Sequence, residues 1–102
     1  MHFILFYQVV EGFTDKRTLY RAAHLEKLKE AHQAGNLVLA GALADPADGA
    51  VLIFNGSDQQ VAEDFAKADP YVTEKLVKSW TVRKWMTVIG EGSTPPSLPK
   101  PT

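Results

Sequence analysis

The stretch that decides the fold is residues 2–10, which read HFILFYQVV. Aromatic and β-branched side chains are typical of a β-strand, and here apolar residues occupy both odd and even positions. A strand with one face in water would alternate apolar and polar residues. We therefore expect this strand to be buried on both faces, which requires a packing layer on each side of its sheet.

A helix is predicted directly after this strand. Gly12 breaks the strand, and Thr14 or Asp15 can cap a helix that runs to about Ala34. Gly35 then ends the helix, because glycine is favoured where the chain turns left-handed.

The next part of the chain predicts a hairpin. Residues 37–44 and 51–54 are apolar strands, and between them residues 45–49, DPADG, have turn chemistry. A short turn between two strands implies that they pair antiparallel.

A second helix and a fourth strand complete the pattern. Residues 57–60, SDQQ, have the form of a capping box that opens a helix through about Ala68. Asp69-Pro70 restarts a short helix, because aspartate caps well and proline fits the first helical position. Residues 79–89 predict a long strand.

The resulting order, β-α-β-β-α-β, predicts an α+β, ferredoxin-like fold with a four-stranded antiparallel sheet. Two helices cover only one face of such a sheet. The strand at 79–89 nevertheless places Trp80 and Val82 on one side and Trp85 on the other. An uncovered apolar face would be a large adhesive patch, so we expect a homodimer, with two sheets packed face to face as a dimeric α/β barrel.

Composition narrows the partners and the chemistry. The chain has 102 residues, a net charge of −1 and no cysteine. We expect one domain over residues 1–89 and a flexible, Pro-rich tail over residues 90–102. Dispersed Lys and Arg argue against nucleic acid, and the lack of cysteine excludes disulfides and thiolate sites.

The apolar start is too short to span a bilayer and lacks the features of a signal peptide, so we expect no membrane association and a cytoplasmic location.

His24 is a titratable side chain in the predicted first helix, and its position on the core-facing side needs an explanation. By helical periodicity, Leu28 lies about 40° and Ala31 about 20° from it around the axis, so His24 faces the core. Either it is a hydrogen-bonded core histidine or it performs acid/base work. His32 is eight residues away, about 12 Å along the axis, which is too far to share one metal ion, so we expect no metal site.

Asp69 is the carboxylate that can partner this histidine. Capping alone would select an aspartate before Pro70, so the residue has a purely structural explanation as well. Whether the side chains of His24 and Asp69 meet decides between a structural and a functional interpretation.

Several segments together resemble the YciI-like (YCII-related) family of small dimeric α/β-barrel proteins over residues 1 to about 89. The carriers are the first strand, Arg21-Ala22-Ala23-His24-Leu25, residues 34–43 (AGNLVLAGAL), Ala68-Asp69-Pro70-Tyr71 and Val82-Arg83-Lys84-Trp85. The family pattern often has Gly-Pro where this chain has Gly41-Ala42, and the Pro-rich tail is a second departure.

The resemblance implies that His24 and Asp69 form an acid/base pair in a pocket. Arg21, one helical turn before His24, is then placed to hold a substrate carboxylate or enolate. Gly41 would allow a ligand to approach the backbone closely. Tyr71 and Trp85 are candidates for the pocket lining.

Three functions follow as hypotheses. The first is a lyase or isomerase, of the dehydrochlorinase kind found in this family, that transfers protons on a small aromatic or lactone-like substrate. The second is a non-catalytic module that binds a small ligand. The third is a heme- or cofactor-free oxygenase, which rests on fold analogy alone. No cofactor motif is present, so we expect no cofactor.

Overall fold

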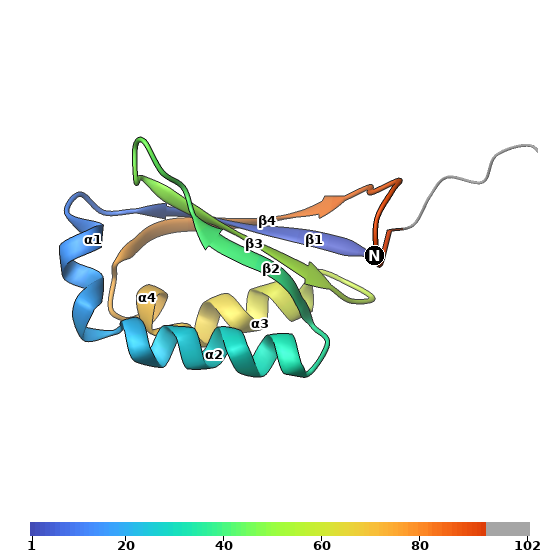
Figure 1. The fold of residues 1–102 in the computed structure, drawn as a ribbon, viewed down its shortest axis with the longest axis horizontal. Helices are drawn as coiled ribbons and strands as arrows, with labels where there is room; N and C mark the ends of the chain where they lie inside the picture. The colour runs from blue at the N-terminus through green and yellow to red at the C-terminus, as the bar shows by residue number, and fades with distance from the viewer. Residues whose placement is uncertain (94–102) are drawn as a thin grey trace, which may run out of the picture.

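The computed structural model of the protein describes residues 1–93 (Figure 1). Within that range no helix has the length and apolar character needed to cross a membrane. The elements follow in the order β1 (His2–Val9), α1 (Phe13–Lys16), the 3-10 turn η1 (Arg17–Leu19), α2 (Arg21–Gln33), β2 (Leu37–Ala42), β3 (Gly49–Asn55), α3 (Gln60–Ala68), α4 (Pro70–Thr73) and β4 (Val77–Trp85).

The four strands form one sheet in the order β2-β3-β1-β4, and every neighbouring pair is antiparallel. This is the predicted ferredoxin-like arrangement, and β2 and β3 are the predicted hairpin. β1 lies at the centre of the sheet, between β3 and β4. Its central place explains why the opening stretch of the sequence is so rich in apolar residues.

The helices all lie on one face of the sheet (Figure 1). The residues of β1 that point toward them are buried, and Leu5 is fully so. Its partners in register, Leu52 on β3 and Val82 on β4, lie on the same face. The buried core combines this sheet face with the inner faces of the helices, through Phe3, Leu5, Tyr7, Val9, Phe13, Leu37, Leu52, Phe54, Ala62, Phe65, Ala66, Tyr71, Leu76 and Val77.

The opposite face of the sheet is apolar, and no helix within residues 1–93 lies on it. Ile4 and Phe6 of β1 lie there, beside Ile53 and Val51 of β3 in register. All four side chains are half-buried, and Leu39 of β2, which pairs with Ile53, is 67% exposed. The sequence predicts that the first strand is buried on both faces. Within residues 1–93 only the face toward the helices is covered, and Ile4 and Phe6 on the other face are half-buried, so burial of the second face stays a prediction.

The predicted single first helix is divided. Gly12, at a left-handed φ of 75°, turns the chain directly after β1, and Phe13 follows into the core. Thr14 and Asp15 therefore lie inside the short helix α1, and the prediction that either of them caps the helix is wrong. Tyr20, at φ −114°, then separates the 3-10 turn from α2.

The predicted capping box at residues 57–60 is also wrong. Helix α3 begins at Gln60, whose N–H donates to Oδ1 of Asp58 at 2.9 Å. The Gln60 side chain donates forward to Asp64 at 2.6 Å and does not reach back to Ser57. The residue at the N-cap position is Gln59, which forms no side-chain cap bond, and the first helical N–H is received by the carboxylate of Asp58, a stronger acceptor than a hydroxyl.

The last strand begins and ends earlier than predicted. β4 spans Val77–Trp85, so residues 86–89 lie beyond it. The chain then returns toward β1: a Cβ built at Gly92 would lie 2.8 Å from Nε2 of His2. Of the predicted tail, residues 94–102 lie outside the described residues. The division into a domain at 1–89 and a tail at 90–102 stays a prediction.

Candidate functional site

His24 is the only buried residue of helix α2. Its neighbour Leu25 is 44% exposed, and Leu28 and Ala31 pack partly buried against the core. The predicted orientation of His24 is therefore confirmed. Since core-facing positions of a helix normally hold aliphatic side chains, an imidazole at the most buried position indicates a polar partner inside the protein.

That partner is Asp69, which joins α3 to α4. Its backbone is extended, Pro70 occupies the first helical position, and Oδ1 accepts the N–H of Tyr71 at 3.0 Å. The predicted cap is confirmed. A cap of a surface helix stays in water, whereas the Asp69 side chain is 0% exposed, so capping does not account for its environment.

Two side chains from distant elements meet at this carboxylate. Nδ1 of His24 lies 2.8 Å from Oδ1 of Asp69, and the hydroxyl of Tyr7, from β1, donates to Oδ2 at 2.7 Å. An ionised carboxylate only accepts, which assigns the proton to Nδ1 and leaves Nε2 as the nitrogen free for a ligand. Within residues 1–93, no group of three or more His, Cys, Asp and Glu side chains gathers as metal ligands would.

Two aromatic rings hold the imidazole in its plane. The ring of Tyr71 stacks on that of His24 at a centroid distance of 3.7 Å and an angle of 10°. Phe13 meets the Tyr71 ring edge-on at 5.3 Å and 89°. The histidine is thus fixed by a hydrogen bond at one edge and by a stack on one face, and an imidazolium is additionally stabilised by an aromatic face.

A pocket of about 200 Å³ opens beside this histidine. His24, Tyr7 and Tyr71 line it, together with Arg17 and Arg21 from the helical layer and the part of β2 around Gly41. Leu25 and Leu28 form part of its wall and do not close it. A buried histidine–carboxylate pair on the wall of an open pocket is an arrangement suited to proton transfer.

The family model of the YCII-related domain matches residues 1–86 of this chain. The chain belongs to the YCII-related family. No curated protein is significantly similar to it in sequence.

The fold of this YCII-related protein is similar to that of a solved structure. It is 5-chloro-2-hydroxyhydroquinone dehydrochlorinase (TftG) from Burkholderia phenoliruptrix AC1100, in complex with 2,5-dihydroxybenzoquinone. The similarity covers 92% of this chain and 100% of the other, with a TM-score of 0.72 and 20% sequence identity. At this level of identity the comparison establishes the fold, and the site must be argued from this chain's own residues.

Most of the predicted site residues of the YCII-related chain come together. Arg21, Gly41 and Tyr71 line the pocket with His24, and Asp69 lies behind the imidazole. Trp85 does not line this pocket. It pairs with His2 in the sheet register, which places it on the face away from the helices, where it is 44% exposed.

Two polar residues that line this pocket, Tyr7 and Arg17, were not among the predicted site residues. Alternation along the first strand places Tyr7 on the same face as Leu5, and a tyrosine at a core position indicates a hydroxyl with a partner. Arg17 lies one turn before Arg21, but the division of the first helix into α1, η1 and α2 was not foreseen. Of these two residues, only Tyr7 could have been found from the sequence, because strand alternation marks it as a polar residue in the core.

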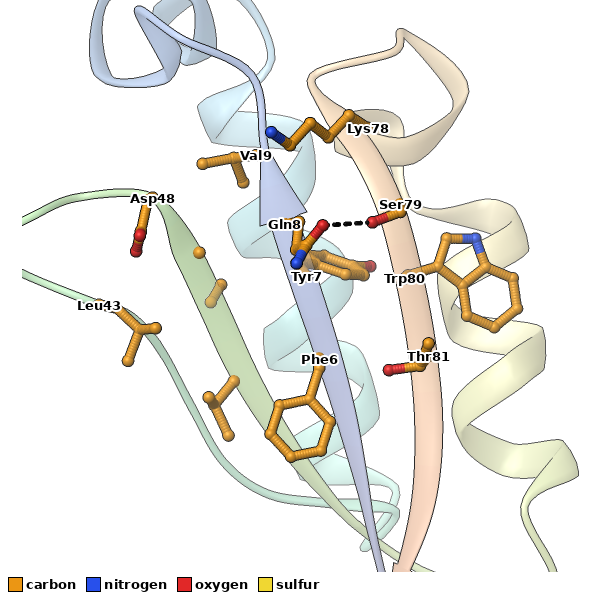
Figure 2. A pocket seen from close by; sticks show the side chains of 13 residues that line it. Phe6, Tyr7, Gln8, Val9, Leu43, Asp48, Lys78, Ser79, Trp80 and Thr81 are labelled. Atoms are coloured by element: carbon orange, nitrogen blue, oxygen red, sulfur yellow. Dashed lines mark hydrogen bonds between the residues drawn. The ribbon is translucent and has the colours of Figure 1, made fainter.

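A larger hollow of about 640 Å³ lies on the helix-free sheet face of the YCII-related domain (Figure 2). Figure 2 shows Phe6, Gln8 and Thr81 among its lining residues, with Ser79 donating to Gln8 Oε1 at 2.9 Å. It contains no histidine among its lining residues. Despite its size, it therefore lacks the groups that make the smaller pocket a candidate for chemistry.

Replacing Tyr7 by phenylalanine is expected to lower the free energy of unfolding by about 1–3 kcal/mol, because a buried carboxylate oxygen loses its donor. Urea unfolding at pH 7 measures this effect. Tyr20→Phe is the matched control, since the half-buried Tyr20 makes no side-chain hydrogen bond within residues 1–93. Equal stabilities of the two variants would contradict a bonded role for the Tyr7 hydroxyl.

The same variant has a signature at alkaline pH. Burial, and then the charge of Asp69 and the hydrogen bond to it, raise the pKa of Tyr7. The unfolded tyrosine ionises near pH 10, so the associated stability is fully present below about pH 10 and is lost as the pH rises toward the folded-state pKa. Stability should therefore fall with pH above 10 more steeply in the wild type than in Tyr7→Phe.

Proposed function

We propose that this YCII-related protein is an enzyme in which His24 and Asp69 transfer a proton on a small ring substrate, as a lyase or an isomerase. The observation that carries the proposal is the bond from Nδ1 of His24 to the fully buried Asp69, on the wall of a pocket. Asp69 orients the imidazole and stabilises its protonated form, so that Nε2 is the base.

The electron flow for an elimination is direct. Nε2 of His24 takes a proton from a carbon or hydroxyl of the substrate, and the electron pair of the broken bond forms a new C=C or C=O bond. A leaving group, such as chloride, departs with its own bonding pair. In an isomerisation the imidazolium instead returns the proton to another carbon of the same molecule. Neither route requires a cofactor.

The size of the pocket supports a substrate with one ring. An apolar cavity of about 150 Å³ is large enough for benzene, whereas drug-sized ligands occupy about 300–1,000 Å³. A pocket of about 200 Å³ accommodates a single substituted ring. The structural neighbour is a dehydrochlorinase bound to a dihydroxybenzoquinone, which supports an aromatic or lactone-like substrate class.

The test is turnover of a panel of chlorinated and unchlorinated hydroxyaromatics and of small lactones, followed by absorbance and by chloride release. We expect at least one member to be consumed faster than in buffer. If panel members bind, as shown by shifts in melting temperature, and none is consumed, the protein is a binding module and the catalytic proposal is wrong.

We further propose that the protein acts as a homodimer through the helix-free face of its sheet. This face exposes apolar side chains from β1, β2 and β3, and no segment within residues 1–93 covers it. A second copy presents the same face, so the two sheets can cover each other in a symmetric contact.

Introducing a charge into this face is expected to produce a monomer. Phe6→Glu places a carboxylate at the centre of the contact, where burial without a partner is strongly unfavourable. Light scattering at micromolar concentration should report a dimer for the wild type and a monomer for the variant. The control is Leu19→Glu, which changes an 84% exposed residue in the helical layer and should leave the dimer intact. A stable wild-type monomer would refute the proposal.

A further inference from the structure

Two guanidinium groups line the pocket beside His24. Arg17 lies in η1 and Arg21 begins α2, so they are four residues apart on nearly continuous helical backbone. Neither forms an ion pair with a carboxylate within residues 1–93. Like charges at this spacing repel each other, and a shared anion would relieve that repulsion.

The guanidinium of Arg17 is held at the pocket by an aromatic ring. Its Cζ lies 5.5 Å from the centroid of Phe13, the same ring that meets Tyr71 edge-on. The side chain of Arg17 is accordingly half-buried. A guanidinium over an aromatic ring retains N–H groups that can bind an anion.

The Tyr71 hydroxyl provides an independent indication of a ligand. Tyr71 is 3% exposed, and its hydroxyl has no hydrogen-bond partner within residues 1–93. Burial raises the pKa of Tyr71, while the charges of Arg21 and Arg17 act in the opposite direction. Arg21 lines the same pocket as Tyr71, and its positive charge acts on the hydroxyl.

These observations place an unpartnered O–H donor within the field of two cations. A buried hydroxyl without an acceptor is costly, and such groups in folded proteins usually have a partner that binds there. A guanidinium only donates, and the tyrosine hydroxyl, although its oxygen can also accept, still has a proton to donate. The partner that receives all of these N–H and O–H groups is an acceptor with negative charge.

We propose that Arg17, Arg21 and the Tyr71 hydroxyl form an anion subsite, and that the substrate of the pocket is a planar ring that carries a carboxylate. This proposal depends on the proposed function in one respect, namely that the substrate ring lies beside His24. A carboxylate is flat, matches the fork of a guanidinium and adds little volume to a ring, as a pocket of about 200 Å³ requires.

The experiment compares 2-hydroxybenzoate with its neutral isostere 2-hydroxybenzamide by isothermal titration calorimetry. We expect the wild type to bind the benzoate at least about tenfold more tightly, because charge-assisted hydrogen bonds are the strong ones. Arg17→Gln and Arg21→Gln should each lower the affinity for the benzoate about tenfold, and Tyr71→Phe should lower it while preserving the stack on His24. Each of the three should lower the affinity for the amide by less than the affinity for the benzoate, because the amide carbonyl accepts hydrogen bonds but carries no charge.

The matched control is Lys29→Gln, which removes an exposed positive charge from the same helix outside the pocket and should have no effect. Equal affinities for benzoate and benzamide, or an Arg17→Gln variant that binds both as the wild type does, would overturn the anion subsite. Binding is measured without turnover. A charge preference that persists in His24→Ala therefore supports the subsite even if no substrate of the enzyme is found.

Discussion

His24→Ala is expected to lower kcat/KM by about 10²–10⁴-fold on whichever panel member the wild type consumes, the usual contribution of a positioned general base. The variant removes the Nε2 that faces the pocket and also the donor to Oδ1 of Asp69. His32→Ala, on the exposed side of the same helix, is the control and should retain full rate.

A second substitution separates catalysis from packing. In His24→Gln the side-chain amide can still donate to Asp69, but it cannot accept a proton from a substrate. We expect His24→Gln to be closer to the wild type in melting temperature than His24→Ala, yet to lose as much activity. Full activity in either variant would show that His24 is not the base.

Asp69 carries the second large prediction, because its replacement affects both stability and rate. Asp69→Ala removes a helix cap and leaves the buried donors of His24 and Tyr7 unpaired. Loss of a cap costs about 0.5–2 kcal/mol and each of the two unsatisfied buried donors about 1–3 kcal/mol, so we expect the free energy of unfolding to fall by about 2.5–8 kcal/mol. Urea or thermal unfolding measures this loss.

Asp69→Asn tests the chemical role with less disturbance of packing. The amide can still cap α4, but it cannot stabilise an imidazolium as a carboxylate does, and its NH₂ group can select the wrong tautomer of His24. The expected loss in kcat/KM is about 10²–10⁴-fold with the fold retained. Asp64→Asn, at an exposed aspartate of α3, is the control and should change stability by less than about 0.5 kcal/mol.

If Asp69→Asn retained the wild-type rate while Asp69→Ala unfolded, the aspartate would be a structural cap and no more. That outcome would leave His24 without an orienting partner in the mechanism. It would show that catalysis does not depend on a His24–Asp69 pair, and the proposed acid/base mechanism would be wrong.

Local patterns accounted for the side chains whose environment is set by near neighbours. Helical spacing correctly predicted that His24 faces the core, and the Asp69-Pro70 pair correctly predicted the start of a helix. Capping was less predictable at α3, where Ser57 and Asp58 are both competent acceptors and only the observed start at Gln60 distinguishes them. The left-handed turn at Gly12 likewise moved the first helical turn ahead of Thr14.

Contacts between distant residues were beyond such patterns. Tyr7 and Asp69 are 62 residues apart and bond only because β1 lies at the centre of the sheet, above the junction of α3 and α4. Trp85 is the opposite case, a predicted pocket residue that does not reach the pocket. The register of β4 against β1 places it on the face of the sheet away from the pocket.

By itself the sequence determined the order of strands and helices, the two-sided apolar character of residues 2–10, and the candidates His24 and Asp69. These follow from periodicity and turn chemistry, which act over a few residues. Only the tertiary structure decided that His24, Asp69 and Tyr7 share one buried network and that Arg17 joins Arg21 at the pocket. Packing of the helical layer on the sheet sets these distances, and no local interaction specifies them.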